Sequence, residues 1–390
     1  MTTAPRLLWT GSVARMGRVV ILALALSTRL VAAQEPVSAQ TLKAALDSLR
    51  TTARFPGATL GISLPGGISL GVASGFSDTV RKVPMQATDR LLQGSVGKTY
   101  VAAIALQLVQ EGTLSLDDPI AKYLGSEPWF TRLPNSARIT VRHLMQHTSG
   151  LVRWEFDPAA AAVMRAHPFK VWTPVERLGY LFDKPAPFEA GAGWEYSDTN
   201  YIVLGMIIER ITGRTYYDEL HRRLLRPLHL VNTIPSDRRR LEKVVNGYAG
   251  PRNDLGGFDA SLVDGMLAVN PQLEWTGGGV ASTSQELAHW LRILFTGRVI
   301  PQPLLDQMVA GVPARLGANV RYGLGMMIRD TPLGPAWGHS GFFPGYATEA
   351  LYFPELDMAV AIQVNVTDPY PRGLVPFLIH VAGIVPSTKR

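Results

Sequence analysis

The stretch LLQGSVGKTYVAA, residues 91–103, places a serine three residues before a lysine at the expected start of a helix. Serine is a favoured N-cap residue and lysine is a good helix former, so Ser95 and Lys98 could simply begin a surface helix. Residues three apart on a helix share a face, however, so the amine of Lys98 can also approach the hydroxyl of Ser95. A serine hydroxyl becomes a nucleophile when a neighbouring base takes its proton. The rest of the chain has to decide between capping and catalysis.

The first 33 residues have the pattern of a secretory signal rather than of a folded element. Arginines precede a short apolar run at 19–27, and the small residues at 31–33 suit signal cleavage. We therefore expect residues 1–33 to be removed on export, leaving a periplasmic or extracellular domain of residues 34–390. The apolar run is too short to span a bilayer, and no later segment has about 20 consecutive apolar residues, so no membrane anchor is expected.

The composition excludes several classes of function. The chain has 390 residues, 46% of them hydrophobic and 18% charged, which is enough to bury a large core. Residues 1–33 hold four arginines and no acid, so the remainder has 34 basic and 31 acidic residues, a net charge of +3. This charge does not indicate a nucleic-acid partner, and we interpret the basic run at 236–240 as a solvated surface. The absence of cysteine excludes disulfides, thiolate metal sites and cysteine nucleophiles.

The apolar periodicity separates helical from strand-like segments. Helical spacing and caps predict helices at about 41–50, 95–112, 140–147, 200–211, 283–297 and 374–382, with a capping box between Thr283 and Glu286. Alternating or β-branched runs predict strands at 58–64, 68–73, 346–353 and 358–364. Because strands come from both ends of the chain, we predict an α/β (α+β) fold with an antiparallel sheet flanked by helices. The sheet would use about residues 40–94 and 300–390, and a large, mostly helical insertion would occupy about residues 95–299.

Two further motifs compete with Ser95 as the chemical centre. Residues 67–71 read GISLG, which matches a nucleophile elbow at Ser69, but this serine lies inside a predicted strand and no helix follows it. His143 and His147 lie four apart on a short helix, a spacing that can hold a metal, but Leu144 stands where a zinc protease has its glutamate base. We interpret both motifs as structural.

A polar, aromatic loop, EYSDTNY at 195–201, precedes an apolar helix. Ser197, Asp198 or Thr199 can act as the N-cap of that helix, and Tyr196 can be a packing residue. A phenol beside a lysine can also relay protons to a leaving group, which gives the loop a second interpretation.

Taken in order, SVGK at 95–98, YSD at 196–198 and WGHSG at 337–341 strongly resemble the serine β-lactamase and penicillin-binding protein superfamily, in particular its class C β-lactamase, DD-peptidase and esterase branch. Two further segments, HTSGL at 147–151 and GGGVAST at 277–283, resemble structural landmarks of that branch. The order and spacing of the motifs are specific, whereas any one motif alone is weak. The resemblance implies a β-lactamase/transpeptidase-like sheet with a helical insertion.

The resemblance also implies roles for single residues. Ser95 would be the acylated nucleophile, Lys98 its proton acceptor or electrostatic helper, and Tyr196 the shuttle that carries the proton to the leaving group. Water would release the acyl group, so no cofactor and no metal are implied. The amide groups of Ser95 and Phe342 would form the oxyanion hole. The residues that would bind the substrate or line the cleft are Asp198, His339, Ser340, Gly341 and Phe342.

Two positions depart from the pattern of the superfamily. Asp198 stands where asparagine is usual, and an ionised aspartate can only accept hydrogen bonds and would raise the pKa of Lys98. His339 stands where the β-lactamases usually have lysine, and histidine is a weaker permanent cation near neutral pH. Both changes favour an ester or a simple amide over a β-lactam as substrate.

We therefore expect an exported serine hydrolase that cleaves an ester or amide of a small molecule or peptide, such as a D-alanyl peptide, a β-lactam or a small ester, through an acyl-enzyme on Ser95. A carboxylesterase or D-Ala-D-Ala carboxypeptidase type is favoured over a β-lactamase. Two alternatives stay open: a catalytically weak penicillin- or peptidoglycan-peptide-binding protein that acts as a sensor or scaffold, and a true class C-like β-lactamase. Covalent labelling without product release would favour the binding protein.

Overall fold

The central element is an antiparallel sheet. The computed structural model describes residues 38–250 and 258–385, and the predicted signal segment at 1–33 lies outside the described residues. Within the described residues nine strands form this sheet, in the order β3-β2-β1-β14-β13-β12-β11-β10-β9. The strands are β1 (Gly57–Ser63), β2 (Ser69–Asp78), β3 (Val83–Pro84), β9 (Val312–Pro313), β10 (Val320–Tyr322), β11 (Met327–Thr331), β12 (Gly334–Phe343), β13 (Tyr346–Phe353) and β14 (Met358–Val364).

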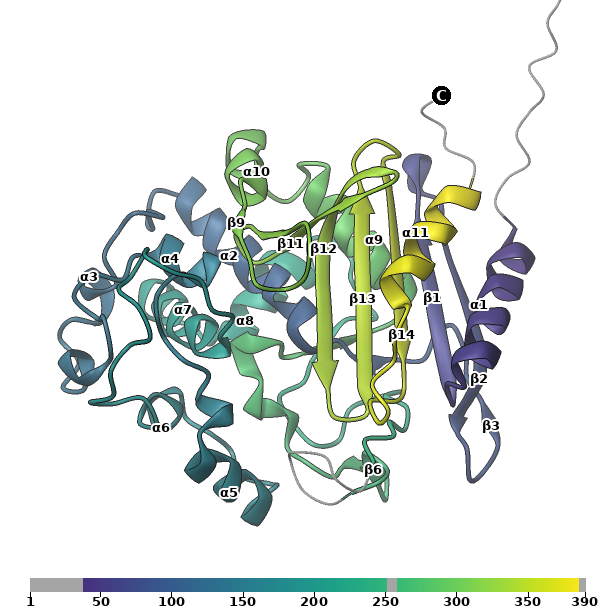
Figure 1. The fold of residues 1–390 in the computed structure, drawn as a ribbon, viewed down its shortest axis with the longest axis horizontal. Helices are drawn as coiled ribbons and strands as arrows, with labels where there is room; N and C mark the ends of the chain where they lie inside the picture. The colour runs from purple at the N-terminus through teal and green to yellow at the C-terminus, as the bar shows by residue number, and fades with distance from the viewer. Residues whose placement is uncertain (1–37, 251–257, 386–390) are drawn as a thin grey trace, which may run out of the picture. The chain divides into compact units, whose positions relative to one another are not determined.

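The two ends of the chain meet in the middle of this sheet. Every residue of β1, β13 and β14 is buried, as expected of strands that are covered on both faces. Leu60 on β1 pairs with Val72 on β2 and with Ile362 on β14. Figure 1 shows this meeting as purple β1 beside yellow β14. The predicted fold class, an antiparallel sheet built from both chain ends and flanked by helices, is confirmed.

Helices cover both faces of the sheet. Leu46 and Leu378 pack with the strands in one apolar core, which places α1 and α11 on the same face (Figure 1). On the other face α9 approaches closely because Gly61 has no side chain; a Cβ there would lie 2.1 Å from the Ser284 carbonyl oxygen. The helices are α1 (Ala39–Ala53), α2 (Lys98–Gln110), α3 (Ala121–Leu124), α4 (Val141–Gln146), α5 (Pro158–Ala166), α6 (Pro174–Leu178), α7 (Asp198–Thr212), α8 (Tyr216–Leu220), α9 (Ser284–Phe295), α10 (Gln302–Val309) and α11 (Leu374–Ile384).

A second apolar core lies in the mostly helical part of the chain and surrounds α2. Residues 98–106 of this helix are all buried, so α2 is packed on every side rather than amphipathic. Tyr100 of α2 stacks on Trp290 of α9 with ring centroids 4.2 Å apart, which ties this core to the helix behind the sheet. Two small sheets accompany it: β4 (Leu91–Leu92), β8 (Val280–Ser282) and β5 (Ile234–Pro235) form one, and β6 (Leu262–Val263) with β7 (Met266–Leu267) forms the other.

Two local predictions are wrong in an informative way. The helix expected from residue 95 begins at Lys98, and Ser95 lies in the preceding 3₁₀ turn η2 (Gly94–Gly97), so Ser95 does not cap α2. Thr283 caps α9 by accepting from the Glu286 amide, but the Glu286 carboxylate does not close a capping box. It accepts instead from the amide of Asn232 and the hydroxyl of Thr233, which joins α9 to the segment before β5.

None of the helices in the described part of the chain is both long and apolar enough for a membrane crossing.

Candidate active site

The turn that carries Ser95 is compressed between a strand and a loop. A Cβ on Gly94 would lie 2.4 Å from the Phe342 amide nitrogen of β12, and one on Gly97 would lie 1.7 Å from the Gly278 carbonyl oxygen. Glycine is therefore required on both sides of Ser95, because only a residue without a side chain lets the two neighbours approach so closely. This packing explains the two glycines of the sequence GSVG. It also fixes the Ser95 hydroxyl where α2 and β12 meet.

Lys98 is the most constrained side chain of the site. Its ammonium group donates to the Ser95 Oγ at 3.0 Å, to the Asp198 Oδ1 at 2.5 Å and to the Gly277 carbonyl oxygen at 2.5 Å. An ammonium group has three N–H donors, so all of them are engaged. Burial alone would lower the pKa of Lys98, but the negative charge of Asp198 raises it above its ordinary value. The resting lysine is therefore a cation that holds Ser95.

Asp198 is the first residue of α7 and supplies the counter-charge. Burial works against its ionisation, but Lys98 and then Arg153 lower the pKa of Asp198 below its ordinary value. The Arg153 guanidinium lies 4.0 Å from the second carboxylate oxygen. The N-terminus of α7 also favours an anion at this position. Asp198 is thus an ionised acceptor at the edge of the site.

Tyr196 presents its phenol to Lys98 and Ser95, and both act on its pKa as hydrogen-bond neighbours. The Lys98 ammonium lies 5.0 Å from the centre of its ring. The hydroxyl is buried and has no hydrogen-bond partner of ordinary length among the described residues. Burial raises the pKa of Tyr196, while the positive charge of Lys98 works in the opposite direction. A neutral phenol beside a lysine and a serine can both take and give a proton.

His147, the C-cap of α4, fixes the loop that carries Tyr196. Its Nδ1 accepts from the Ser197 amide at 3.2 Å and faces the Asn200 side-chain nitrogen at 3.0 Å. Burial lowers the pKa of His147 well below its ordinary value, so the ring is neutral. The Nδ1 of His143 instead accepts a hydrogen bond from the amide of Thr140 at the start of α4. No group of three or more metal-ligating side chains occurs in residues 38–250 and 258–385.

The edge of β12 that faces Ser95 is not covered by a strand. β12 pairs with β11 only between Gly334 and Gly338, whereas its pairing with β13 runs on to Phe343. A Cβ on Gly341 would lie 1.8 Å from the Gln93 carbonyl oxygen, so this part of β12 packs directly on the turn before Ser95. Backbone groups beyond Gly338 are therefore placed where a substrate carbonyl would meet Ser95.

His339 points from β12 into the buried site. Its Nε2 lies 2.8 Å from the Tyr322 hydroxyl and its Nδ1 lies 2.5 Å from the Ser340 carbonyl oxygen. Burial and the nearby Lys98 charge lower the pKa of His339 to about 3. The ring is neutral at physiological pH, and it accepts from the tyrosine when the proton is on Nδ1. Tyr322 itself carried no recognisable sequence signal, because it lies on a three-residue strand.

The side chains of Ser340 and Phe342 lie outside the cluster around Ser95. Successive side chains of a strand point to opposite faces, and Ser340 accepts from Arg329 at 2.7 Å and donates to Glu349 at 2.9 Å. The Phe342 ring is half exposed and lies 6.2 Å from that of Tyr370.

Sequence reasoning missed a charged pair beside the site. The Arg153 Nε donates to Glu155 at 2.6 Å, and the Arg153 guanidinium lies 5.5 Å from the Tyr196 ring. Burial raises the pKa of Glu155 to about 7. A cavity of about 330 Å³ next to Arg153 is lined by residues that include Phe156, Tyr180 and Glu195. Arg153 and Glu155 follow the motif at 147–151 in sequence. Nothing in the sequence around them indicated that Arg153 lies beside Asp198.

The structure thus brings together Ser95, Lys98, Tyr196, Asp198 and His339, with the backbone of β12 beside them. A serine held by a buried lysine at the start of a helix, opposite an uncovered strand edge, defines a serine–lysine class of site on this fold. The family model described as Beta-lactamase matches residues 42–380, and the chain belongs to this family.

Known proteins similar to this chain include two enzymes and a penicillin-binding protein. Penicillin-binding protein 4* of Bacillus subtilis is 26% identical over 70% of this chain and 60% of its own length. A D-aminopeptidase of Brucella anthropi is 26% identical over 75% of this chain and 52% of its own length. The chain therefore spans about half to three fifths of these two curated relatives. The crystal structure of a D-stereospecific amidohydrolase from Streptomyces sp. is 29% identical, covers 88% of this chain and 98% of its own, and has a TM-score of 0.75.

Proposed function

We propose that the protein is a serine hydrolase that forms an acyl-enzyme on Ser95. The observation that carries the proposal is the 3.0 Å contact between the Ser95 hydroxyl and the ammonium group of Lys98, whose side chain is buried. The Ser95 Oγ would attack a carbonyl carbon, forming a C–O bond, and the C–N or C–O bond to the leaving group would then break. Water would hydrolyse the acyl group and restore Ser95.

The charge states favour Lys98 as an electrostatic helper over Lys98 as the proton acceptor. Its three donors are engaged and its pKa is raised, so it holds no vacant lone pair at rest. Tyr196 is then the proton shuttle: its oxygen takes the Ser95 proton while its own proton passes to the leaving group. The fixed charge of Lys98 stabilises the negative charge that develops on either oxygen. The amides of Ser95 and Phe342 would receive the carbonyl oxygen.

The substrate that we propose is a small amide with a free amine, such as an amino-acid amide or short peptide. Asp198 is ionised and can only accept, so it suits a substrate that donates from an ammonium or N–H group. His339 is neutral and offers no permanent cation to a substrate carboxylate, which disfavours a carboxypeptidase or β-lactamase. The names D-aminopeptidase and D-stereospecific amidohydrolase among the similar proteins support this class. A small ester is the second substrate class.

A panel of substrates tests the proposal. D- and L-amino-acid amides, a short-chain ester, a chromogenic cephalosporin and a D-alanyl-D-alanine peptide are offered to the wild type and to Ser95→Ala. We expect turnover of D-amino-acid amides above all others, an acyl mass on the Ser95 peptide, and loss of both in the variant. Undiminished turnover in Ser95→Ala, or a label on Ser69, would refute the mechanism. Labelling without product release would establish the binding protein instead.

We also propose that the protein is exported, on the pattern of residues 1–33. Mass spectrometry of the protein isolated from its own cells tests this. We expect an N-terminus close to Gln34 in the envelope or medium, and an intact N-terminus in the cytoplasm would contradict it.

A further inference from the structure

A group of buried polar atoms lies behind the site, around the turn Trp275–Gly279. A Cβ on Gly278 would lie 2.7 Å from the Glu274 Oε1, and one on Gly279 would lie 3.1 Å from the Tyr217 hydroxyl. The Ser236 amide donates to the Gly279 carbonyl oxygen at 2.9 Å. The side chains of Glu274 and Tyr217 and the backbone of Ser236 therefore border the same two glycines.

These side chains have few close partners: Ser236 approaches the Tyr217 hydroxyl, and the Gly279 amide approaches the Glu274 carboxylate. The Glu274 Oε2 and the hydroxyls of Tyr217 and Ser236 are inaccessible to solvent and have no hydrogen bond of ordinary length to any described residue. Nearly all buried polar groups in folded proteins bind protein or ordered water. Several such groups converging on one place are the setting in which internal water is held.

The turn is directly connected to the nucleophile. The Gly277 carbonyl oxygen accepts from Lys98 at 2.5 Å, and so provides one of the three acceptors of the ammonium group. A Cβ on Gly277 would lie 3.4 Å from the Asp198 Cβ, so the turn also contacts the second acceptor. A displacement of this turn would change the position of Lys98 and, with it, the hydrogen bond to Ser95.

The groups that face Glu274 come from three helices: Lys98 from α2, Asp198 from α7 and Tyr217 from α8, with Arg177 of α6 facing Tyr217. Burial and then the Asp198 charge raise the pKa of Glu274 to about 8, and Lys98 opposes them only in part. At neutral pH Glu274 is therefore an uncharged acid. It carries a proton that it can donate.

We propose that Glu274 is a positioning residue, which binds internal water together with Tyr217 and Ser236 and so holds the Gly277 carbonyl on Lys98. The role rests on the proposed acyl-enzyme function of Ser95. When Glu274 ionises, a second carboxylate beside Asp198 competes for the Lys98 ammonium. The hydrogen bond from Lys98 to Ser95 is then weakened, and acylation slows.

The variants Glu274→Gln and Glu274→Leu test this role, with the exposed Glu189→Gln as matched control. For a short-chain ester, which has no amine that titrates near pH 8, we expect kcat/KM of the wild type to fall above about pH 8. Glu274→Gln mimics the uncharged acid, so its kcat/KM at pH 7 should stay within about twofold of the wild type. Its kcat/KM should no longer fall above about pH 8, because Lys98 and Tyr196 titrate at still higher pH. Glu274→Leu removes the hydrogen bonds and should lower kcat about tenfold with little change in KM. Inactivity of Glu274→Gln at pH 7, or an unchanged alkaline fall, would overturn the role.

A spectroscopic readout separates this role from the proposed function. The infrared spectrum at pH 7 should contain protonated carboxylic acid absorption from Glu274 and from Glu155, whose pKa is about 7, and the Glu274 component should disappear in Glu274→Gln and persist in Glu189→Gln. Absence of a Glu274-dependent band would overturn the inference even if the enzyme turns over amides. If the wild type cleaves no amide or ester, the proposed function fails, while the band and a crystal structure showing water on Glu274 still test the position and the proton.

Discussion

At the scale of single residues, the charge on Asp198 has the greatest influence on the site. It neutralises Lys98 at 2.5 Å, and its second oxygen faces Arg153 at 4.0 Å. Because both neighbours are cations, the carboxylate stays ionised and offers only lone pairs to a substrate. An asparagine would keep one acceptor for Lys98 but would turn a donor toward the substrate.

The variant Asp198→Asn should therefore change substrate preference. For an amino-acid amide, loss of a hydrogen bond to a charged group costs about 1.5–3 kcal/mol, so we expect kcat/KM to fall about ten- to hundredfold. For a neutral short-chain ester the change should be a few-fold at most. The ratio of the two kcat/KM values is the measurement, with the exposed Asp183→Asn as control. An unchanged ratio would show that Asp198 does not select the substrate.

At the scale of elements, the site depends on close contact between β12 and the turn η2. The glycines at 94 and 341 let the two backbones meet, as the added-Cβ distances of 2.4 and 1.8 Å show. The other edge of β12 is held by its ladder with β13, and Ser340 also donates to Glu349 of β13. The strand is thus fixed from one side and free on the side that faces Ser95.

The variant Gly341→Ala should separate folding from catalysis. Its methyl group would collide with the Gln93 carbonyl and push β12 away from Ser95, and a displacement of about 1 Å at a reaction centre costs about a hundredfold in rate. We expect a comparable loss in the rate of Ser95 acylation, measured by mass spectrometry, in a protein that still unfolds cooperatively. Gly383→Ala in α11 is the control, because its nearest neighbour, Leu333, lies 3.9 Å away. Equal acylation rates in the wild type and Gly341→Ala would contradict the argument.

At the scale of the whole molecule, the sequence predicted those helices and strands that a local pattern of apolar residues defines. The strands at 346–353 and 358–364 have the predicted bounds, because continuous apolar runs end at clear turn residues. The short strands β9 and β10 were missed, because two or three residues carry no periodicity. The contacts of Lys98 and Asp198 were also only partly predictable: Gly277, which accepts from Lys98, and Arg153, which faces Asp198, are both distant in sequence, and no local pattern records such a contact.

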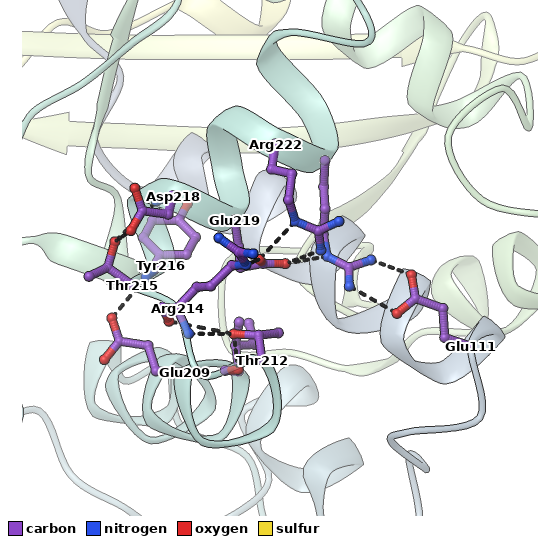
Figure 2. A network of polar contacts seen from close by, with 11 residues as sticks. Glu111, Glu209, Thr212, Arg214, Thr215, Tyr216, Asp218, Glu219 and Arg222 are labelled. Atoms are coloured by element: carbon purple, nitrogen blue, oxygen red, sulfur yellow. Dashed lines mark hydrogen bonds and ion pairs between the residues drawn. The ribbon is translucent and has the colours of Figure 1, made fainter.

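Away from the site, an ion-pair network joins three helical segments of the second core. Figure 2 shows Glu219 of α8 facing Arg214 and Arg222, with Glu111 beyond them. The Glu219 carboxylate is fully buried and accepts from Arg222 at 2.6 Å and from Arg223 at 2.5 Å. Arg223 also donates to Glu111, which follows the last residue of α2. Arg223 therefore bridges two carboxylates from different parts of the chain.

The variant Glu219→Gln should destabilise the fold without changing the chemistry. Removing one partner of a buried ion pair costs about 3–5 kcal/mol, and we expect the lower end because Arg222 is half exposed. Burial would raise the pKa of Glu219, but Arg222 and Arg223 lower it in the folded state. The ionised carboxylate therefore stabilises the fold at pH values above the pKa of Glu219 in the unfolded chain. This stabilisation is lost as the pH falls through the pKa of Glu219 in the folded protein. The free energy of unfolding should thus decline less steeply below about pH 4.5 in the variant than in the wild type. Chemical denaturation from pH 3 to 7 measures this.

The exposed pair of Glu189 and Arg138 supplies the control, since Glu189→Gln should change stability by less than about 1 kcal/mol. Glu111 lies about 20 Å along α2 from Lys98, so kcat/KM of Glu219→Gln below its unfolding temperature should equal that of the wild type. Equal stability of Glu219→Gln and wild type at pH 7 would show that the network contributes nothing net. A loss of activity in the folded variant would show instead that α2 transmits strain from its C-terminus to Ser95, and that the two ends of this helix are not independent.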